Sequence, residues 1–239
     1  MNPSAYGWLM LAGIIVSIFF WSRLARRDDR LLLVYVAALL GAFLGAKLVY
    51  LLAEGWIDWA QPDRWRRLLT GKTILGGLLG GYVSVEIAKR LVGYRSATGD
   101  WFALIVPVGI LFGRAGCWLH GCCLGQVCAV SWYTVKDSAG VDRWPAVPME
   151  IAFNLLALLA ALILRWRKIL PGQHFHLYLI AYGIFRFAHE FFRDTPRVLG
   201  PLSGYTLAAL ATTGLGVVGF ILRRREGRGS KLETLNIKL

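Results

Sequence analysis

The sequence is dominated by seven apolar runs of 16 to 23 residues, separated by short polar stretches. They cover residues 4–21, 31–53, 73–88, 101–119, 148–164, 175–192 and 201–222. A helix needs about 20 apolar residues to cross the hydrocarbon core of a bilayer, and within lipid the backbone must satisfy its own hydrogen bonds. The runs therefore predict an all-α integral membrane protein with about seven transmembrane helices.

The composition excludes a soluble chain and a disordered one. Hydrophobic residues make up 56% of the sequence and charged residues 17%, with a mean hydropathy of +0.53, whereas soluble globular proteins are about a quarter charged. The seven runs leave no room in 239 residues for a separate soluble domain. We expect residues 1–222 to form one transmembrane domain and residues 223–239 to form a basic cytoplasmic tail.

The distribution of charge predicts the orientation in the membrane. The chain has 27 Lys and Arg against 14 Asp and Glu, a formal net charge of +13. Sixteen basic residues flank the runs on one side and eight on the other, so the positive-inside rule places the N-terminus outside and the C-terminus in the cytoplasm. No basic stretch is longer than the flank of a run, which favours membrane lipid as a partner over nucleic acid. The first run lacks a basic leader and a cleavage site, so we expect an uncleaved anchor.

Two of the predicted outside loops are more than simple connectors. Residues 54–71 contain Trp56, Trp59 and Trp65 beside several arginines, a pattern typical of a short helix at the membrane interface. Residues 125–147 form a stretch that is long for a connection between helices.

Several ionisable residues fall inside or at the ends of the predicted helices, where an unpaired charge is costly and therefore indicates function. They are Lys47, Glu86, Asp100, Arg114, Arg186 and Glu190. Glu86 and Lys89 can instead reach the inner interface together, and Arg186 and Glu190 can form a local ion pair on one helical face. For Lys47 we leave both function and an internal ion pair open.

Arg114 gives the strongest of these signals. It follows Gly113 and lies two residues before Gly116, and glycines let a ligand or a second helix approach the backbone closely. A guanidinium suits bidentate binding of phosphate, and in a membrane cavity the obvious phosphate belongs to a phospholipid. The glycine-rich stretch 76–81 indicates either tight helix packing or a groove for an acyl chain or peptide.

The four cysteines are gathered within twelve residues around one histidine: Cys117, His120, Cys122, Cys123 and Cys128. Cysteine and histidine bind soft metals, but no pair of C-x-x-C motifs is present, so we assign no metal and no other cofactor. A disulfide from Cys122 or Cys123 to Cys117 or Cys128, small inert thiols, and a thiol activated by Arg114 or His120 all stay open.

Short motifs follow one another along most of the chain. They are Tyr6-Gly7, Gly-Ala-Lys-Leu-Val-Tyr at 45–50, Gly-Gly-Leu-Leu-Gly-Gly at 76–81, Gly-Arg-Ala-Gly-Cys-Trp-Leu-His-Gly-Cys-Cys-Leu-Gly at 113–125, Pro-Ala-Val-Pro-Met-Glu at 145–150, and Arg-Phe-Ala-His-Glu-Phe-Phe-Arg-Asp at 186–194. With Asp100, fourteen residues before Arg114, they resemble the prolipoprotein diacylglyceryl transferase family in matching order, from residue 6 to about 220. The resemblance implies the membrane fold of that family.

The chain departs from the family pattern at positions that carry chemistry. The family's histidine before the double glycine is Leu75 here, its first signature asparagine is Cys117, its second is His120, and its signature glutamate is Cys122. The arginines that the family uses on phosphate are retained. The resemblance therefore implies lipid binding more directly than it implies activation of the acceptor.

The resemblance implies a reaction in the bacterial cytoplasmic (inner) membrane. A diacylglyceryl group would move from phosphatidylglycerol to the lipobox cysteine in the signal peptide of a prolipoprotein, the first step of lipoprotein maturation. The charge that grows on the leaving phosphate needs fixed cations, which we assign to Arg114 and Arg186, with Glu190 orienting Arg186. For proton removal we name His120, with His189 or water as alternatives. The expected substrate-binding residues are Tyr6, Lys47, Gly76, Gly77, Asp100, Gly113, Gly116, Gly125 and Glu150.

Two other functions stay open at this point. The departures at Leu75, Cys117 and Cys122 favour a membrane enzyme that uses a phospholipid donor with a different acceptor. The third possibility is a catalytically silent homologue that binds lipid or lipoprotein.

Overall fold

The computed structural model describes residues 3–26 and 28–236, and it is mostly helical. Each predicted run corresponds to one long helix. These helices are α1 (Pro3–Ala25), α2 (Arg30–Tyr50), α5 (Ile74–Leu91), α6 (Gly99–His120), α7 (Ala146–Trp166), α8 (His174–Glu190) and α9 (Gly204–Asn236). Five helices in the described part of the chain are long and apolar enough to cross a membrane, and a sixth span is added if a helix pair bent by 47° counts as one. The chain is therefore a multi-pass, helical membrane protein.

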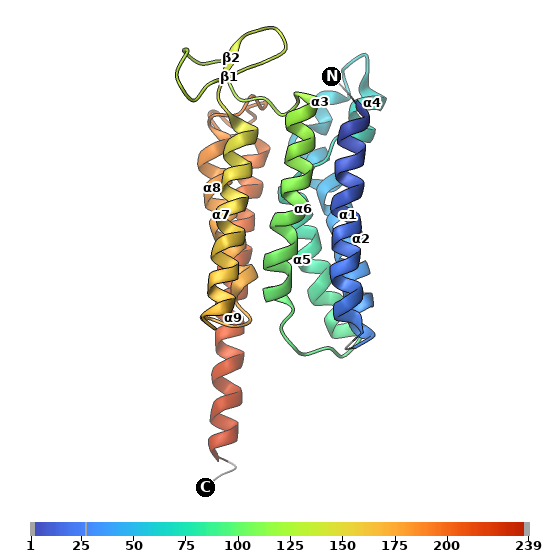
Figure 1. Ribbon diagram of the computed structural model, residues 1–239, viewed down its shortest axis with the longest axis vertical. Coiled ribbons are helices and arrows are strands. Elements are labelled where there is room, and N and C mark those ends of the chain that lie inside the picture. Colours follow the sequence, from blue (N-terminus) through green and yellow to red (C-terminus); the bar gives the residue numbers. More distant parts are fainter. Residues whose placement is uncertain (1–2, 27, 237–239) are drawn as a thin grey trace.

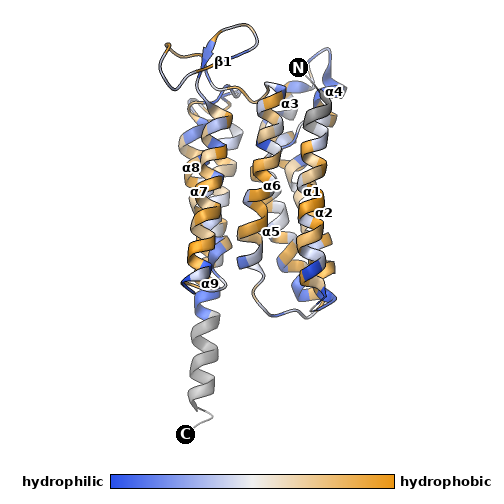
Figure 2. Ribbon diagram, in the orientation of Figure 1, coloured by the Kyte–Doolittle hydropathy of each residue, from blue (hydrophilic) through white to orange (hydrophobic). Residues whose placement is uncertain are grey.

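The helices lie side by side with their axes nearly parallel (Figure 1). Helix α2 packs along α5 and α8 packs along α9, while α6 contacts α1 on one side and α7 and α8 on the other. Apolar residues cover the shafts of the helices and polar residues gather at their ends (Figure 2). Many large apolar side chains point outward, as Leu52 does with 72% of its surface exposed, which is the pattern of a bundle that faces lipid.

Short helical segments close the bundle at the end where α1 begins (Figure 1). Helix α2 continues into the π-turn η1 (Leu51–Gly55) and α3 (Trp56–Asp58), and α4 (Arg64–Thr70) precedes the bend into α5. The short helix predicted within residues 54–71 is therefore confirmed. Opposite this end, α9 extends beyond the other helices as far as Asn236, so the basic tail predicted from residue 223 begins inside a helix.

The long loop between α6 and α7 contains the two strands found among the described residues. Strands β1 (Val135–Lys136) and β2 (Asp142–Arg143) pair antiparallel. The Asp137 carboxylate accepts hydrogen bonds from the backbone N–H groups of Ala139 and Val141, and Gly140 has a positive φ of 80°. An aspartate that caps its own turn beside a left-handed glycine closes a hairpin locally. The hairpin lies in a loop outside the helical bundle, so the predicted all-α fold class holds.

Gly76 and Gly80, two of the four glycines in residues 76–81, allow close helix packing on one face of α5. A Cβ atom at Gly76 would collide with the backbone carbonyl of Gly45, and one at Gly80 would collide with that of Gly41. At Gly77 the nearest atom, the carbonyl oxygen of Ala42, lies 3.6 Å from the ideal Cβ position, which is ordinary contact. Close approach of two backbones therefore explains Gly76, whereas Gly77 is free of that constraint.

This difference gives a prediction for two neighbouring substitutions. Gly76→Ala should destabilise the protein by about 1–3 kcal/mol, because the backbones of α2 and α5 must separate to admit the methyl group. Gly77→Ala should be neutral or slightly stabilising, because alanine is the better helix former by about 1 kcal/mol. Thermal unfolding of both variants in one detergent measures the difference, and equal melting temperatures would contradict the packing argument.

Candidate functional site

Two carboxylates and three arginines meet where α6, α7 and α8 come together at the hairpin end of the bundle. Arg114 Nη2 of α6 lies 2.8 Å from Glu150 Oε2 of α7. Arg186 of α8 reaches both acids, with Nη1 3.8 Å from Glu150 Oε2 and Nη2 2.8 Å from Glu190 Oε2. Arg193, just beyond α8, lies 4.0 Å from Glu150 Oε2 and 3.8 Å from Glu190 Oε2. We call these five residues the arginine cluster.

Helical spacing explains how α8 contributes to this cluster. Arg186 and Glu190 are four residues apart and so lie on one face, and Arg193 follows three residues later in a turn that continues that face. Side chains three or four residues apart in a helix are neighbours. The local ion pair expected between Arg186 and Glu190 is present, and its members contact residues of other helices as well.

Both carboxylates are held by hydroxyl groups, so their positions are fixed from two sides. Glu150 is fully buried and its Oε1 accepts a 2.6 Å hydrogen bond from Tyr182. Glu190 is 1% exposed and its Oε1 accepts hydrogen bonds from Thr195 at 2.7 Å and Ser203 at 3.1 Å. Buried carboxylates anchored in this way orient guanidinium groups with little freedom to move.

The arginine cluster is short of negative charge. Three guanidinium groups face two carboxylates, and all five side chains are buried. Within the described part of the chain, Arg114 Nε and both Nε and Nη1 of Arg186 and Arg193 have no hydrogen-bond partner. Burial lowers the pKa of Arg193, and the positive charges of Arg186 and Arg114 lower it further. Buried donors with a surplus positive charge form a site for an anion.

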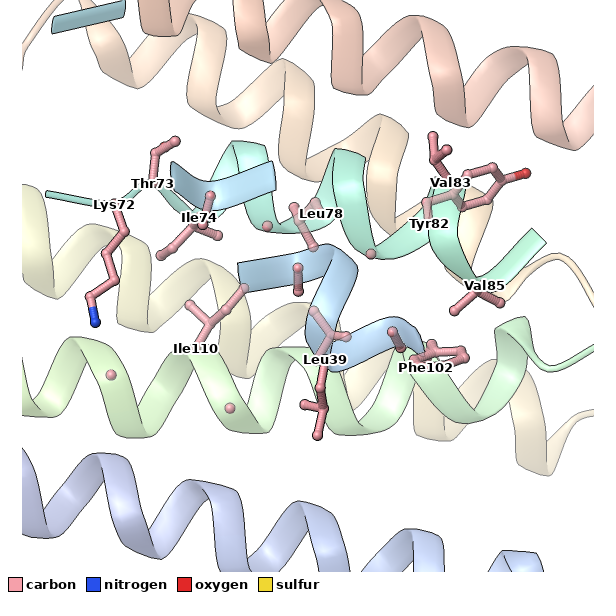
Figure 3. A pocket seen from close by; sticks show the side chains of 18 of the residues that line it. Leu39, Lys72, Thr73, Ile74, Leu78, Tyr82, Val83, Val85, Phe102 and Ile110 are labelled. Carbon is pink, nitrogen blue, oxygen red and sulfur yellow. The ribbon is translucent and has the colours of Figure 1, made fainter. Parts of the chain in front are cut away.

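A cavity of about 1430 Å³ opens beside this cluster. The three arginines form part of its wall, while the glutamates lie behind them and do not line it. Much of the remaining wall is apolar, and Figure 3 shows side chains of α2, α5 and α6, among them Leu39, Leu78 and Ile110, around the hollow. The volume exceeds the roughly 300–1,000 Å³ that is usual for small-molecule sites. A large apolar hollow with cations at one end fits a ligand that has an anionic head and a long apolar body.

The structure brings several of the predicted site residues to this cavity. Arg114, Arg186, Gly113, His120 and Gly77 all line it. Gly116 is buried in α6 one turn from the same wall. The shared hollow is what joint binding of one anion by Arg114 and Arg186 requires.

Other predicted residues lie elsewhere or have different surroundings. Asp100 is at the start of α6, fourteen residues and therefore about 21 Å along the axis from Arg114, and it accepts hydrogen bonds from the backbone N–H groups of Gly172 and His174. Lys47 does not line the cavity and donates to the carbonyl of Gly71 at 3.2 Å. We therefore leave Asp100 and Lys47 out of the site proposed below.

Of three further predicted residues, Glu150, Gly125 and Tyr6, the first two do not line the cavity. Glu150, expected to bind substrate, bridges arginines instead and has no surface on the cavity. A Cβ atom at Gly125 would collide with the backbone carbonyl of Trp144, so this glycine serves packing of the hairpin loop. The side chain of Tyr6 lies outside the described residues.

Sequence reasoning did not select Arg193 as a site residue. Arg193 directly follows the sixth apolar run, residues 175–192, so the pattern assigns it to the loop after that run. Its spacing of three residues from Glu190, within the motif 186–194, is the signal that places it on the same helical face.

The cysteines form a second feature of the cavity wall. Cys117, Cys122 and Cys123 line it, and all four cysteines are free thiols. The disulfide, one of the three alternatives that the sequence left open, is not formed among the described residues, where Cys123 Sγ lies 3.9 Å from Cys117 Sγ and 3.7 Å from Cys122 Sγ. Thiol contacts with Cys117 and Cys122 lower the pKa of Cys123, and Arg114 and Arg193 lower it further.

Fold and site together define a multi-pass helical membrane protein with a buried cationic group at one end of a large apolar cavity. The chain belongs to the prolipoprotein diacylglyceryl transferase family, whose family model matches residues 2–222. This confirms the resemblance drawn from the motifs. The family is one of transferases.

Individual relatives support the assignment over most of the chain. A phosphatidylglycerol–prolipoprotein diacylglyceryl transferase of Rhodospirillum rubrum is 30% identical over an alignment 253 positions long, which covers 94% of this chain and 90% of the relative. The enzyme of the same name from Clostridium tetani is 27% identical, with 92% of each chain covered. That of Dehalococcoides mccartyi is 29% identical and covers 96% of this chain and 92% of its own.

Proposed function

We propose that this chain transfers the diacylglyceryl group of phosphatidylglycerol to the lipobox cysteine of prolipoproteins in the bacterial cytoplasmic membrane. The observation that carries the proposal is the surplus positive charge of the arginine cluster, exposed to an apolar cavity. The family and the names of the relatives point to the same reaction. All seven long helices would then cross the bilayer, with the N-terminus and the arginine cluster on the outer side.

The reaction replaces the bond from the diacylglyceryl carbon to phosphate oxygen with a bond from that carbon to sulfur. The phosphodiester carries one negative charge, and the departing glycerol phosphate carries two, so negative charge grows on the phosphate as the C–O bond breaks. Arg114, Arg186 and Arg193 offer buried, fixed donors for this charge, which is where preorganised cations accelerate a reaction most. Glu150 and Glu190 act as positioning residues, because they contact the guanidinium groups and not the cavity.

The acceptor thiol must lose its proton before it attacks. Leu75 stands at the position of the family's histidine, and a leucine side chain cannot accept the proton. It is also fully buried and does not line the cavity. His120 lines the cavity near the arginine cluster and is the remaining candidate from the sequence. His189 is buried and has no surface on the cavity, so we do not retain it.

The proposal predicts a specific product. Purified protein in phosphatidylglycerol vesicles should convert a synthetic lipobox peptide into a species heavier by one diacylglyceryl unit, as read by mass spectrometry. A peptide with serine in place of the lipobox cysteine should stay unmodified. If the protein binds the lipid but adds no mass to the cysteine peptide, the acceptor is a different molecule or the chain is a silent binding protein.

Complementation in cells provides the independent check. The gene should sustain a bacterium that is depleted of its own diacylglyceryl transferase. Growth would exclude the silent homologue, whereas failure to grow with the protein present in the membrane would favour a different acceptor.

A further inference from the structure

Three sulfur atoms come together at the end of α6, on the wall of the cavity. Cys117, Cys122 and Cys123 have their Sγ atoms within 4.8 Å of one another, and Cys123 lies 3.9 Å and 3.7 Å from the other two. Cys117 is buried and the other two thiols are half-buried. We call this group the thiol triad.

The backbone at the end of α6 is shaped to bring these thiols together. Gly121 is left-handed, with a φ of 68°, its N–H bonds to the carbonyl of Trp118, and the N–H of Cys122 bonds to the carbonyl of Cys117. This pair of bonds is a Schellman motif, which folds the chain back onto the last helical turn. Cys122 is thereby set against Cys117, five residues earlier.

Cys123 completes the triad through an uncommon backbone conformation. Its φ is 62°, a region in which residues other than glycine are rarely found. Strained residues of this kind gather at functional sites, where the surroundings hold them in place. The conformation turns the Cys123 side chain back to the two other sulfurs instead of along the departing chain.

The geometry points to a metal site that the sequence spacing did not predict. We propose that the thiol triad binds Zn²⁺ through three thiolates and leaves the fourth coordination position open to the cavity. Tetrahedral coordination at a Zn–S distance of about 2.3 Å separates the sulfur atoms by about 3.8 Å, which matches the 3.7 and 3.9 Å observed. Three protein ligands with one open position are the pattern of catalytic zinc sites.

The occupant of the open position follows from the reaction, so this step rests on the proposed function. A zinc-bound thiol is deprotonated at neutral pH, and the lipobox cysteine thiol enters the same cavity to be alkylated. Its proton passes to water at the outer interface, so this step does not require His120 as the base. The metal-bound thiolate attacks the glyceryl carbon, the C–S bond forms, the C–O bond breaks, and the electron pair leaves with glycerol phosphate.

The position of the triad suits this step. Arg114 lies three residues before Cys117, and residues at this spacing share a helical face with Cβ atoms about 5–6 Å apart. A thiolate held at the triad would therefore stand next to the guanidinium that faces the phosphate. The site would also supply the deprotonation that Leu75 cannot provide.

Metal content tests the site directly, without reference to activity. Protein purified with a reducing agent and Zn²⁺ should retain about one zinc ion per chain, and replacement by Co²⁺ should give the thiolate-to-cobalt charge-transfer band. Cys123→Ser should lower zinc affinity more than about tenfold, since even the loss of outer-shell partners costs that much. Cys128→Ser is the matched control and should bind normally, because Cys128 is outside the triad. No bound zinc, or a disulfide within the triad of freshly purified protein, would overturn the proposal.

The open position is tested with the Co²⁺-loaded protein and peptide alone, in vesicles free of phosphatidylglycerol. The lipobox cysteine peptide should shift the charge-transfer band, and the serine peptide should not. A bound metal with no shift would overturn the role in acceptor binding. A protein that binds metal through the triad yet transfers no diacylglyceryl group in the product assay would keep the metal site and lose the proposed function, so the two failures are distinguishable.

Discussion

Arg114→Ala should lower kcat/KM for diacylglyceryl transfer by at least about 100- to 1000-fold, the loss typical of removing one preorganised donor from a developing anion. Arg114 is buried, lines the cavity and forms the shortest ion pair with Glu150. Without it, the leaving phosphate loses its donor on α6. Arg114→Lys should restore part of the rate, because an ammonium keeps the charge but lacks the planar fork that binds phosphate in two places. Peptide transfer per folded molecule is the measurement.

The control for this experiment is Arg64→Ala, because Arg64 is an exposed residue of α4 that stacks on Trp65. Its transfer rate should match that of the parent protein. Binding to phosphatidylglycerol vesicles separates the functions that were open at the outset. A silent lipid-binding protein would show weaker binding in Arg114→Ala and no turnover in any variant. Arg114→Ala turnover close to that of the parent would remove the arginine cluster from the mechanism.

The fold was predictable from the sequence because the bilayer restricts which secondary structures an apolar segment can form. A run of about 20 apolar residues has no stable arrangement in lipid other than a helix, and each predicted run lies in one long helix apart from a few residues at its ends. The hairpin of residues 125–147 was not predicted, because it lies outside that restriction and depends on a turn around Asp137 that only its own hydrogen bonds specify.

The site was predictable in part, and the reason is helical geometry. Arg114 and Arg186 stand out in the sequence because a charge inside a transmembrane helix is costly and therefore indicates function. The structure brings both arginines to Glu150. Asp100 was grouped with them by its place in a motif, although fourteen helical residues separate it from Arg114 by most of a bilayer. The pairing of α6 with α7, which decides where Glu150 lies, cannot be read from the periodicity of either helix.

The grouping of the three thiols could not be predicted from the sequence, for a different reason. Their spacing suggests no familiar metal motif, since the sulfurs meet through a Schellman turn and a left-handed cysteine, not through two C-x-x-C loops. Gly121 directly after a helix is the sequence signal for such a turn. The positive φ of Cys123 has no signal in the sequence, because tertiary surroundings impose it.

Glu150→Gln should have the largest effect on stability of any single substitution in the arginine cluster. The change leaves three buried guanidinium groups with one carboxylate, and breaking a buried ion pair in this way costs about 3–5 kcal/mol. For a domain of this size, that cost corresponds to a melting temperature lower by about 6–20 °C. The glutamine can still accept the hydrogen bond from Tyr182, so the loss reports on charge. Thermal unfolding in detergent measures it.

Asp63→Asn is the matched control, because Asp63 pairs with Arg67 and both side chains are 50% exposed. An ion pair this open to solvent contributes little to stability, so the melting temperature should fall by less than about 4 °C.

The surplus positive charge of the arginine cluster also predicts that an anionic lipid restores part of the stability lost in Glu150→Gln. Phosphatidylglycerol should raise the melting temperature of Glu150→Gln more than that of the parent protein, since a bound phosphate replaces the missing anion, while a zwitterionic lipid should not. Equal stabilisation by both lipids would mean that the arginine cluster does not hold the phosphate.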